Sequence, residues 1–234
     1  MLSTVLTSFM QNSLCIIPAR GGSKRIPRKN IKNFLGKPII AYSIEAAIDS
    51  GLFSEIMVST DDEEIAEVAR QFGASVPFIR SLSTSDDNAV LADVVDEVAK
   101  AYNKLGSKFD HICCLLPTAP FVTVSMLDEA LLLMKNSGFD SVRPVVKFSY
   151  PIQRALRLMN NCVEMANEEF LYTRSQDLEP MYHDAGMFYW MKSDTLLKGE
   201  KKGGIIISEI SAQDIDTLED WEMAEIKYKI LKNG

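Results

Sequence analysis

Short apolar runs alternate with longer amphipathic segments through the first half of the chain. The apolar runs have the length of β-strands and cover residues 14–17, 55–59, 75–78 and 110–116. The amphipathic segments place apolar side chains at helical spacing and cover residues 39–49, 63–72 and 89–105. Strands that alternate with helices form parallel sheets with helices on both faces. The pattern therefore predicts an α/β fold.

Capping and turn residues mark the ends of these elements. Gly51, Gly73 and Gly106 follow the three predicted helices, as expected of C-terminal caps. Residues 60–63, Thr-Asp-Asp-Glu, supply a cap and an acidic first turn for the second helix. The polar residues 80–88 predict a loop before the third helix.

The second half of the chain starts with the same rhythm and then loses it. Its predicted elements are a helix at 125–136, strands at 141–147, 186–191 and 204–209, and a last helix at 217–231. Residues 148–182 contain short alternating pieces and a polar loop, which predict an inserted hairpin arm. We expect one domain, residues 14–234, with a Rossmann-like, three-layer architecture and a mostly parallel sheet. Residues 1–13 are interpreted as a flexible N-terminal extension or an upstream start.

Composition narrows the class of protein. The 234 residues are 47% hydrophobic, which is enough for one sizeable core. The net charge of -7 argues against a general nucleic-acid binder. No apolar run reaches membrane-spanning length, and the first 13 residues make a poor signal peptide. The four cysteines have no disulfide or metal-ligand spacing. We therefore expect a cytoplasmic protein with reduced thiols and with no nucleic-acid or membrane partner.

A concentration of basic residues directly follows the first predicted strand. Residues 19–30 contain Gly21-Gly22 and five cations, Arg20, Lys24, Arg25, Arg28 and Lys29. Glycine lets a ligand approach the backbone, and N–H groups with cations around them bind polyphosphates. This loop predicts a nucleoside triphosphate site. A solvated run of surface charge is the alternative, and a dinucleotide site is disfavoured because the G-x-G-x-x-G spacing is missing.

Several loop segments are expected to meet at one edge of the sheet. Ligands of open α/β sheets bind beyond the carboxyl ends of the strands. This rule brings together residues 19–30, 80–88, 116–120 and 214–216. The carboxylates of Asp214 and Asp216 lie two apart and point the same way in an extended chain, which suits Mg²⁺. Capping of the last helix, by Asp216 or Thr217, is the alternative.

The order of these motifs resembles the CMP-sialic acid synthetases, the cytidylyltransferases for nonulosonic acids. The resemblance covers nearly the whole chain from Leu14. It is carried by Ile17-Pro18-Ala19-Arg20-Gly21-Gly22-Ser23-Lys24, Lys29-Asn30, Arg80, Asp87, Ala89, Pro117-Thr118-Ala119-Pro120, Gly186, Tyr189 and Asp214-Ile215-Asp216-Thr217. Residues 174–180 and 182–190 most resemble the branch of the family that acts on pseudaminic acid.

The resemblance implies a nucleotidyltransferase that joins CTP and a nonulosonic acid into a CMP-sugar and releases pyrophosphate with the help of Mg²⁺. The implied catalytic residues are Arg20, Lys24, Lys29 and Asp216, and the implied Mg²⁺ ligands are Asp214 and Asp216. The implied nucleotide-binding residues are Ala19, Arg20, Gly21, Gly22, Ser23, Lys24, Asn30, Arg80, Asp87 and Ala89. The implied sugar-binding residues are Leu116, Thr118, Arg174, Gln176, His183, Asp184, Gly186 and Tyr189. A homodimer is also implied, in which each arm reaches toward the partner's site.

Departures from the family pattern bear on the sugar. Leu116 stands where enzymes for N-acetylneuraminic acid carry a glutamine, and Ser81, Leu91 and Ala185 replace a proline, a serine and an asparagine. Leucine cannot make the hydrogen bond of glutamine, so a less polar deoxy sugar such as pseudaminic acid is predicted. Legionaminic acid or another sialic acid is the nearest alternative. Lys29-Asn30 disfavours 3-deoxy-manno-octulosonate, for which Lys-Pro is expected. A non-catalytic nucleotide-binding module or a scaffold is the alternative from another class.

Overall fold

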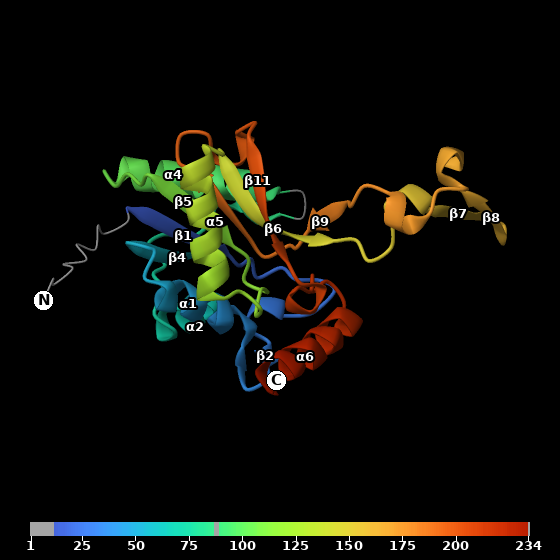
Figure 1. Cartoon of the computed structure of the whole chain (residues 1–234). Helices are drawn as coiled ribbons and strands as arrows, with labels where there is room; N and C mark the ends of the chain where they lie inside the picture. Colours follow the sequence, from blue (N-terminus) through green and yellow to red (C-terminus); the bar gives the residue numbers. More distant parts are fainter. Residues whose placement is uncertain (1–11, 87–88, 234) are drawn as a thin grey trace, which may run out of the picture.

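The computed structural model describes residues 12–86 and 89–233. Within them, a seven-stranded sheet has the order β11-β6-β10-β5-β1-β4, with β9 paired to β6 (Figure 1). Its strands are β1 (Ser13–Pro18), β4 (Glu55–Ser59), β5 (His111–Leu115), β6 (Ser141–Lys147), β9 (Tyr182–Asp184), β10 (Phe188–Lys192) and β11 (Lys202–Ile207). β10 is antiparallel to β5 and β6 and β9 is antiparallel to β6, whereas the other pairs are parallel. The predicted mostly parallel sheet is confirmed.

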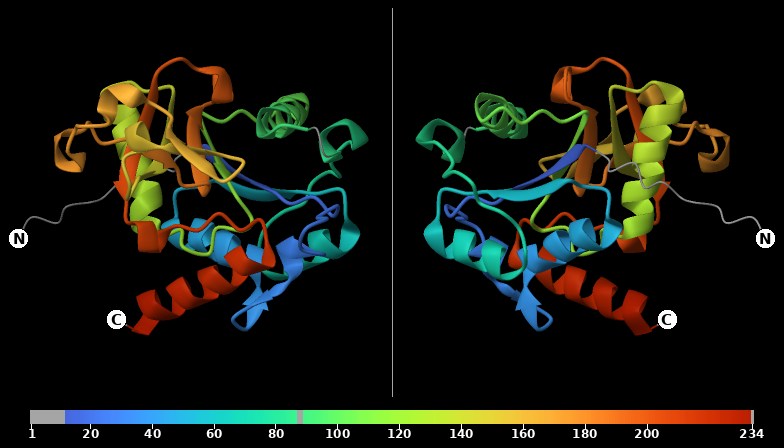
Figure 2. Two further views of the ribbon diagram at one scale, coloured as in Figure 1. Left: turned by 90° about the vertical axis from the view of Figure 1, so that its right-hand side faces the viewer. Right: turned by 90° about the vertical axis from the view of Figure 1, so that its left-hand side faces the viewer.

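Helices cover both faces of the sheet, as predicted (Figure 2). They are α1 (Ile39–Ser50), α2 (Glu63–Gln71), α3 (Leu82–Ser85), α4 (Leu91–Lys104), α5 (Val124–Ser137) and α6 (Leu218–Asn233). The core under α1, α2, α5 and α6 includes Ile17 and Trp190, whereas α4 packs against Leu14 and Ile16 on the opposite face. Because Ile16 and Ile17 are neighbours in a strand, their side chains serve different cores.

An aromatic cluster fastens the C-terminal helix to the first third of the chain. Phe34 belongs to a small hairpin of β2 (Asn33–Phe34) and β3 (Lys37–Pro38). Its ring centroid lies 5.4 Å from those of Tyr42 on α1 and Trp221 on α6, and 5.7 Å from that of Tyr228. These edge-to-face contacts hold α6 against α1 and the β2–β3 hairpin.

The predicted arm is a separate projection on one side of the body (Figure 1). It carries a hairpin of β7 (Leu156–Met159) and β8 (Cys162–Met165). The turn of this hairpin has positive φ at Asn160 and Asn161, 50° and 64°, as a two-residue hairpin turn requires. The Phe148 N–H donates to the Met181 carbonyl at 3.0 Å and closes the base of the arm. The arm therefore ends at Met181, since Tyr182 already pairs in β9.

Some expected boundaries are wrong. Ser13 is buried in β1 and does not belong to an extension; residues 1–11 of that expectation lie outside the described residues. Residues 75–78 make only a single bridge, Met57 to Ser75, because Pro77 has no N–H for a ladder. The segment 80–88 contains α3 within the part that is described. β10 begins at Phe188, because Gly186 is in a left-handed turn with φ of 63°.

Two expectations about partners and redox state can be compared with the structure. All four cysteines are free thiols, with Cys15, Cys113 and Cys114 buried and Cys162 exposed on the arm. No helix formed by residues 12–86 and 89–233 has both the length and the apolar character needed to cross a membrane.

Candidate functional site

The basic loop, residues 19–30, leaves β1 at the carboxyl edge of the sheet and is fixed from beneath by buried side chains. Ile26 lies in the core, and Asn30 is 5% exposed. The Asn30 Nδ2 donates a hydrogen bond to the Arg20 carbonyl at 2.9 Å. Asn30 therefore shapes the loop, and its implied contact with a nucleotide stays a prediction.

A second set of contacts ties the basic loop to the start of α2. Arg28 has a left-handed backbone with φ of 55°. Its guanidinium donates to the Asp62 carboxylate at 2.9 Å and also pairs with Glu64. The hydrogen bond from Arg28 is the main reason that the pKa of Asp62 is lowered. Asp62 also accepts from the Ile65 N–H at 3.0 Å and so caps α2.

The two glycines of the loop have different surroundings. The Gly21 N–H donates to the Asp61 carboxylate at 2.8 Å, so an anionic oxygen accepts from an N–H that the sequence assigns to phosphate. A Cβ atom on Gly21 would lie 2.7 Å from Asp62 Oδ2, whereas one on Gly22 would meet no atom within 4 Å. The close approach to α2 therefore requires glycine only at position 21. The Ser23 N–H donates to the Gly21 carbonyl at 3.0 Å, which makes the loop turn there.

Arg20 joins the basic loop to the segment after residue 79, as predicted, and Arg80 lies close by. Arg80 is 6% exposed, and its Nε donates to the Ser59 hydroxyl at 3.2 Å. Burial lowers the pKa of Arg80, and the negative charge of Asp61 acts against this. Arg20 donates to the Asp86 carbonyl at 2.8 Å, and its positive charge also contributes to lowering the pKa of Arg80. The arrangement concentrates positive charge at the edge of the sheet.

The other predicted nucleotide-binding residues frame this edge. Ala19 is buried, and its N–H donates to the Ser59 carbonyl at 2.9 Å. The Ala89 N–H donates to the Asp86 carboxylate at 2.7 Å. Lys24 is exposed at the surface of the loop. Asp87 lies outside the described residues, so its role stays a prediction.

The acidic pair lies against the basic loop. Asp216 Oδ1 is 3.0 Å from the Arg25 guanidinium and 3.5 Å from Lys29 Nζ. Lys29 Nζ also donates to the Ile215 carbonyl at 2.6 Å. Burial by surrounding atoms, together with the charge of Asp216, raises the pKa of Asp214. Cations of the basic loop and carboxylates of the acidic pair, which are far apart in the sequence, thus lie side by side.

The acidic pair does not cap the last helix. The Asp220 N–H donates to the Thr217 hydroxyl at 3.2 Å, and the Asp220 carboxylate accepts from the Thr217 N–H at 2.8 Å. Thr217 and Asp220 therefore form a reciprocal capping box for α6. Asp214 and Asp216 face a cavity of about 450 Å³ that His183 also lines. The alternative that Asp216 caps α6 is contradicted, whereas Thr217, the other predicted cap, is confirmed.

The predicted sugar side of the site is formed by four residues, Leu116, Asp184, Gly186 and Tyr189. The Leu116 N–H donates to the Met187 carbonyl at 2.8 Å. The Gly186 N–H donates to the Asp184 carboxylate at 2.9 Å, and a Cβ on Gly186 would lie 3.7 Å from Asp214 Cγ. Burial, and then the charge of Asp184 and a hydrogen bond to it, raise the pKa of Tyr189. These residues are therefore continuous with the acidic pair.

Of the remaining predicted sugar residues, His183 lines the same cavity as the acidic pair, whereas Thr118, Arg174 and Gln176 do not line it. Thr118 is half-buried in the segment after β5. His183 Nδ1 lies 2.9 Å from the Asp184 carbonyl, and its ring packs 4.9 Å from that of Phe148. Arg174 pairs with Asp177 at 2.7 Å, and both Arg174 and Gln176 are exposed on the arm, which stands away from the body (Figure 1). Their role in sugar binding stays a prediction.

Sequence reasoning missed functional candidates next to the predicted ones. The sequence places Arg25 among the loop cations but gives no sign of its pairing with Asp216, and it indicates only a helix cap for Asp61. Arg143 pairs with Asp184 at 2.9 Å, and the sequence pattern does not predict this contact. Its signal is a charged residue inside an otherwise apolar strand, Ser-Val-Arg-Pro-Val-Val.

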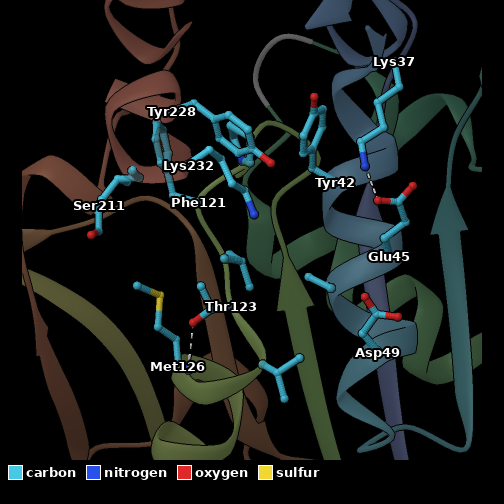
Figure 3. A pocket seen from close by; sticks show the side chains of 15 residues that line it. Lys37, Tyr42, Glu45, Asp49, Phe121, Thr123, Met126, Ser211, Tyr228 and Lys232 are labelled. Atoms are coloured by element: carbon cyan, nitrogen blue, oxygen red, sulfur yellow. Dashed lines mark hydrogen bonds and ion pairs between the residues drawn. The ribbon is translucent and has the colours of Figure 1, made fainter. Parts of the chain in front are cut away.

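A different cavity, of about 520 Å³, lies between α1, the segment before α5 and α6 (Figure 3). Tyr42 and Tyr228 form one wall, and Lys37 pairs with Glu45 at another side. None of the predicted site residues that the structure describes lines it. The convergence of the basic loop and the acidic pair therefore decides where the candidate site lies.

Comparison with known proteins identifies the class. The family model described as cytidylyltransferase matches residues 14–230, so the chain belongs to the cytidylyltransferase family. It is 45% identical over 225 residues to a pseudaminic acid cytidylyltransferase of Campylobacter jejuni, with 93% of this chain and 97% of that one covered. It is 34% identical to the CMP-N,N'-diacetyllegionaminic acid synthase of Legionella pneumophila, with 91% and 94% covered.

Solved structures agree with the fold. A structure of CMP:2-keto-3-deoxy-manno-octonic acid synthetase complexed with CTP superposes with a TM-score of 0.66 at 16% identity. The match covers 95% of this chain and 99% of that one. The predicted nucleotidyltransferase fold is thereby confirmed.

Proposed function

We propose that the protein transfers CMP from CTP to the anomeric hydroxyl of pseudaminic acid and releases pyrophosphate. The 45% identity to the Campylobacter jejuni enzyme supports this sugar, because the match covers 93% of this chain. The ion pair between Lys29 and Asp216 supports the chemistry, because it places a phosphate-binding side chain beside a cation-binding one.

The proposed reaction is a displacement at the α-phosphorus of CTP. The anomeric oxygen forms a bond to the α-phosphorus, the bond from the α-phosphorus to the oxygen shared with the β-phosphate breaks to release pyrophosphate, and the hydroxyl proton passes to solvent water. Arg20 and Lys24 neutralise the triphosphate and the departing pyrophosphate, and Lys29 stabilises the charge that develops between them. Positioning and charge neutralisation supply most of the catalysis in such a transfer.

The acidic pair is the proposed seat of Mg²⁺. Two carboxylates leave coordination positions for phosphate oxygens and water, which is how Mg²⁺ is usually held at nucleotides. Burial, and then the charge of Asp216, raise the pKa of Asp214, so a cation near these carboxylates would offset the cost of their negative charge. Asp214 and Asp216 would hold the ion, which when bound neutralises phosphate charge. Within the described residues no third acidic, histidine or cysteine side chain completes a metal cluster, so the substrate would complete the coordination.

A homodimer is the proposed assembly. The arm exposes apolar side chains that a monomer leaves in water, among them Leu158 at 70% and Val163 at 57%. Contact with a second copy would cover them and bring Arg174 and Gln176 to a partner's sugar site. The free thiols of the chain are consistent with a cytoplasmic enzyme.

The proposed function is tested with purified protein, CTP and Mg²⁺ by measuring pyrophosphate release with a panel of sugars. We expect pseudaminic acid to give the highest kcat/KM, ahead of N,N'-diacetyllegionaminic acid and N-acetylneuraminic acid. A clear preference for either of the other acids would overturn the proposed sugar and keep the chemistry. No pyrophosphate release with any acid, although CTP raises the melting temperature, would favour a non-catalytic nucleotide-binding module.

A further inference from the structure

Arg143 is a charged residue in the interior of an apolar strand. It is the third residue of β6, and its neighbour Val142 pairs with Trp190 of β10. Val142 and Trp190 belong to the core under α1 and α5. Because side chains alternate along a strand, Arg143 lies on the opposite face, the face that also carries Tyr189 and Cys114. Its side chain is 27% exposed.

Residues from two other strands hold the Arg143 guanidinium in place. Nη1 lies 2.9 Å from Asp184 Oδ2 on β9, and the guanidinium carbon lies 4.9 Å from the centroid of the Tyr189 ring on β10. The other oxygen of Asp184 accepts from the Gly186 N–H. A planar guanidinium that rests on an aromatic ring and is anchored at one edge keeps further N–H donors for a second partner.

This assembly is continuous with the reaction centre. Gly186, which Asp184 holds, is next to Asp214: a Cβ on Gly186 would lie 3.7 Å from Asp214 Cγ. Met187 accepts from the Leu116 N–H. Through Asp184 and the turn at Gly186, Arg143 is therefore linked to Asp214, the proposed metal ligand, and to Leu116, the residue that bears on the choice of sugar.

The carboxylate of a sugar acid is repelled by the protein carboxylates at such a site. This carboxylate is attached to the anomeric carbon, so it must lie near the reacting oxygen and hence near Asp214 and Asp216. Two protein carboxylates repel a third in a partly buried place. A cation on the sugar side removes this repulsion, and a guanidinium binds a carboxylate with two parallel hydrogen bonds.

Resting on the proposed function, we propose that Arg143 binds the carboxylate of the sugar acid. Asp184 and Tyr189 are then positioning residues that aim the guanidinium. The assignment covers nonulosonic acids as a class, because all of them carry this carboxylate, and it does not depend on which of them is the substrate.

The test compares Arg143→Met, Arg143→Lys and a control, Arg70→Met. Arg70 is a surface arginine of α2 that pairs with Glu63 at 2.8 Å, so the control also loses an arginine from an ion pair. KM is measured separately for the sugar acid and for CTP. We expect Arg143→Met to raise the sugar KM by about 10- to 100-fold, as for loss of a charge-assisted hydrogen bond. We also expect the CTP KM to change less than about 2-fold and Arg143→Lys to be intermediate.

A second readout separates binding from structure. The C1 carboxamide of the sugar, used as a competitive inhibitor, lacks the negative charge. The wild-type protein should bind the acid more tightly than the carboxamide, and Arg143→Met should abolish that difference. An unchanged sugar KM, or an equal rise in both KM values, would refute the assignment. If the wild-type protein prefers another nonulosonic acid, the proposed sugar is wrong and Arg143 is tested with the preferred acid.

Discussion

Lys29 Nζ lies 3.5 Å from Asp216 Oδ1, and this ion pair joins the basic loop that follows β1 to the segment that precedes α6. The Lys29 side chain is 20% exposed, and it also donates to the Ile215 carbonyl at 2.6 Å. The negative charges of a triphosphate are attracted to the Lys29 side of this pair, and a metal cation is attracted to the Asp216 side. The pair thus places the two halves of a nucleotide and metal site within reach of one substrate.

Asp216 and Asp220 give a matched pair of substitutions four residues apart. Asp216→Ala should abolish Mg²⁺-dependent turnover while CTP still binds, because the proposed metal ligand is lost and the cations of the loop remain. Asp220→Ala should keep most turnover but lower the stability by about 1 kcal/mol, because it breaks the capping box with Thr217. Pyrophosphate release, calorimetric binding of CTP and thermal unfolding measure these effects. Turnover at wild-type level in Asp216→Ala would refute the metal assignment.

The adjacent glycines make a second matched pair. Gly21→Ala forces a Cβ to within 2.7 Å of Asp62 Oδ2, so the Asp62 cap and its pairing with Arg28 must shift. We expect a loss of stability of about 1–3 kcal/mol and a raised KM for CTP. Gly22→Ala meets no atom within 4 Å and should leave the unfolding free energy unchanged. Urea unfolding and CTP titration of both variants test this; equal stability of the two would contradict the described packing.

The order of strands and helices could be predicted because the apolar pattern is strong where strands are buried on both sides. Leu14 to Ile17 are fully buried, and a continuous apolar run is the mark of a central parallel strand. β9 was missed because Tyr182, His183 and Asp184 are polar or exposed residues at an edge, where pairing with β6 and not burial forms the strand. Residues 75–78 were overestimated because an apolar run with a proline lacks a donor.

The candidate site was predictable as a set of segments but not as a set of contacts. The rule for carboxyl ends of strands placed residues 19–30 beside 214–216, and the Lys29–Asp216 pair confirms it. No local sequence pattern predicts that Asp61 accepts from the Gly21 N–H or that Arg143 pairs with Asp184. The two residues are 40 positions apart in the first pair and 41 in the second. The cap of α6 could be predicted in part: Thr217 was one of the two expected caps, and Thr217-Leu218-Glu219-Asp220 has the capping-box spacing with aspartate in the fourth place.

Asp214 should make stability depend on pH in a recognisable direction. Its pKa is raised in the folded protein by burial and by Asp216, so protonation favours the folded state. The free energy of unfolding should therefore increase as the pH falls through this raised pKa. At neutral pH the ionised Asp214 should lower the free energy of unfolding. Asp214→Asn should raise the melting temperature at pH 7 more than at pH 4. A control, Asp128→Asn on the exposed side of α5, removes the same charge. Equal effects of both variants at pH 7 would contradict the raised pKa.

Added Mg²⁺ provides an independent check of the same group. A metal ligand must be deprotonated, so protons compete with the ion at Asp214. The apparent Mg²⁺ affinity measured with CTP should therefore weaken as the pH is lowered through the raised pKa. Asp214→Asn should abolish that pH dependence, whereas Asp128→Asn should keep it.

The arm is expected to mediate self-association. Leu158 and Val163 lie opposite each other in the β7–β8 pair, and their side chains are 70% and 57% exposed. Burial of such a pair in a second copy is favourable, and a charge at its centre makes that burial costly. Leu158→Glu should therefore shift the protein from dimer to monomer in light scattering and lower kcat/KM for the sugar more than for CTP. Leu132→Glu, at a residue of α5 that is 60% exposed, is the control and should stay dimeric. A wild-type protein that is monomeric at all concentrations, or a Leu158→Glu variant that remains dimeric, would exclude the arm as the interface.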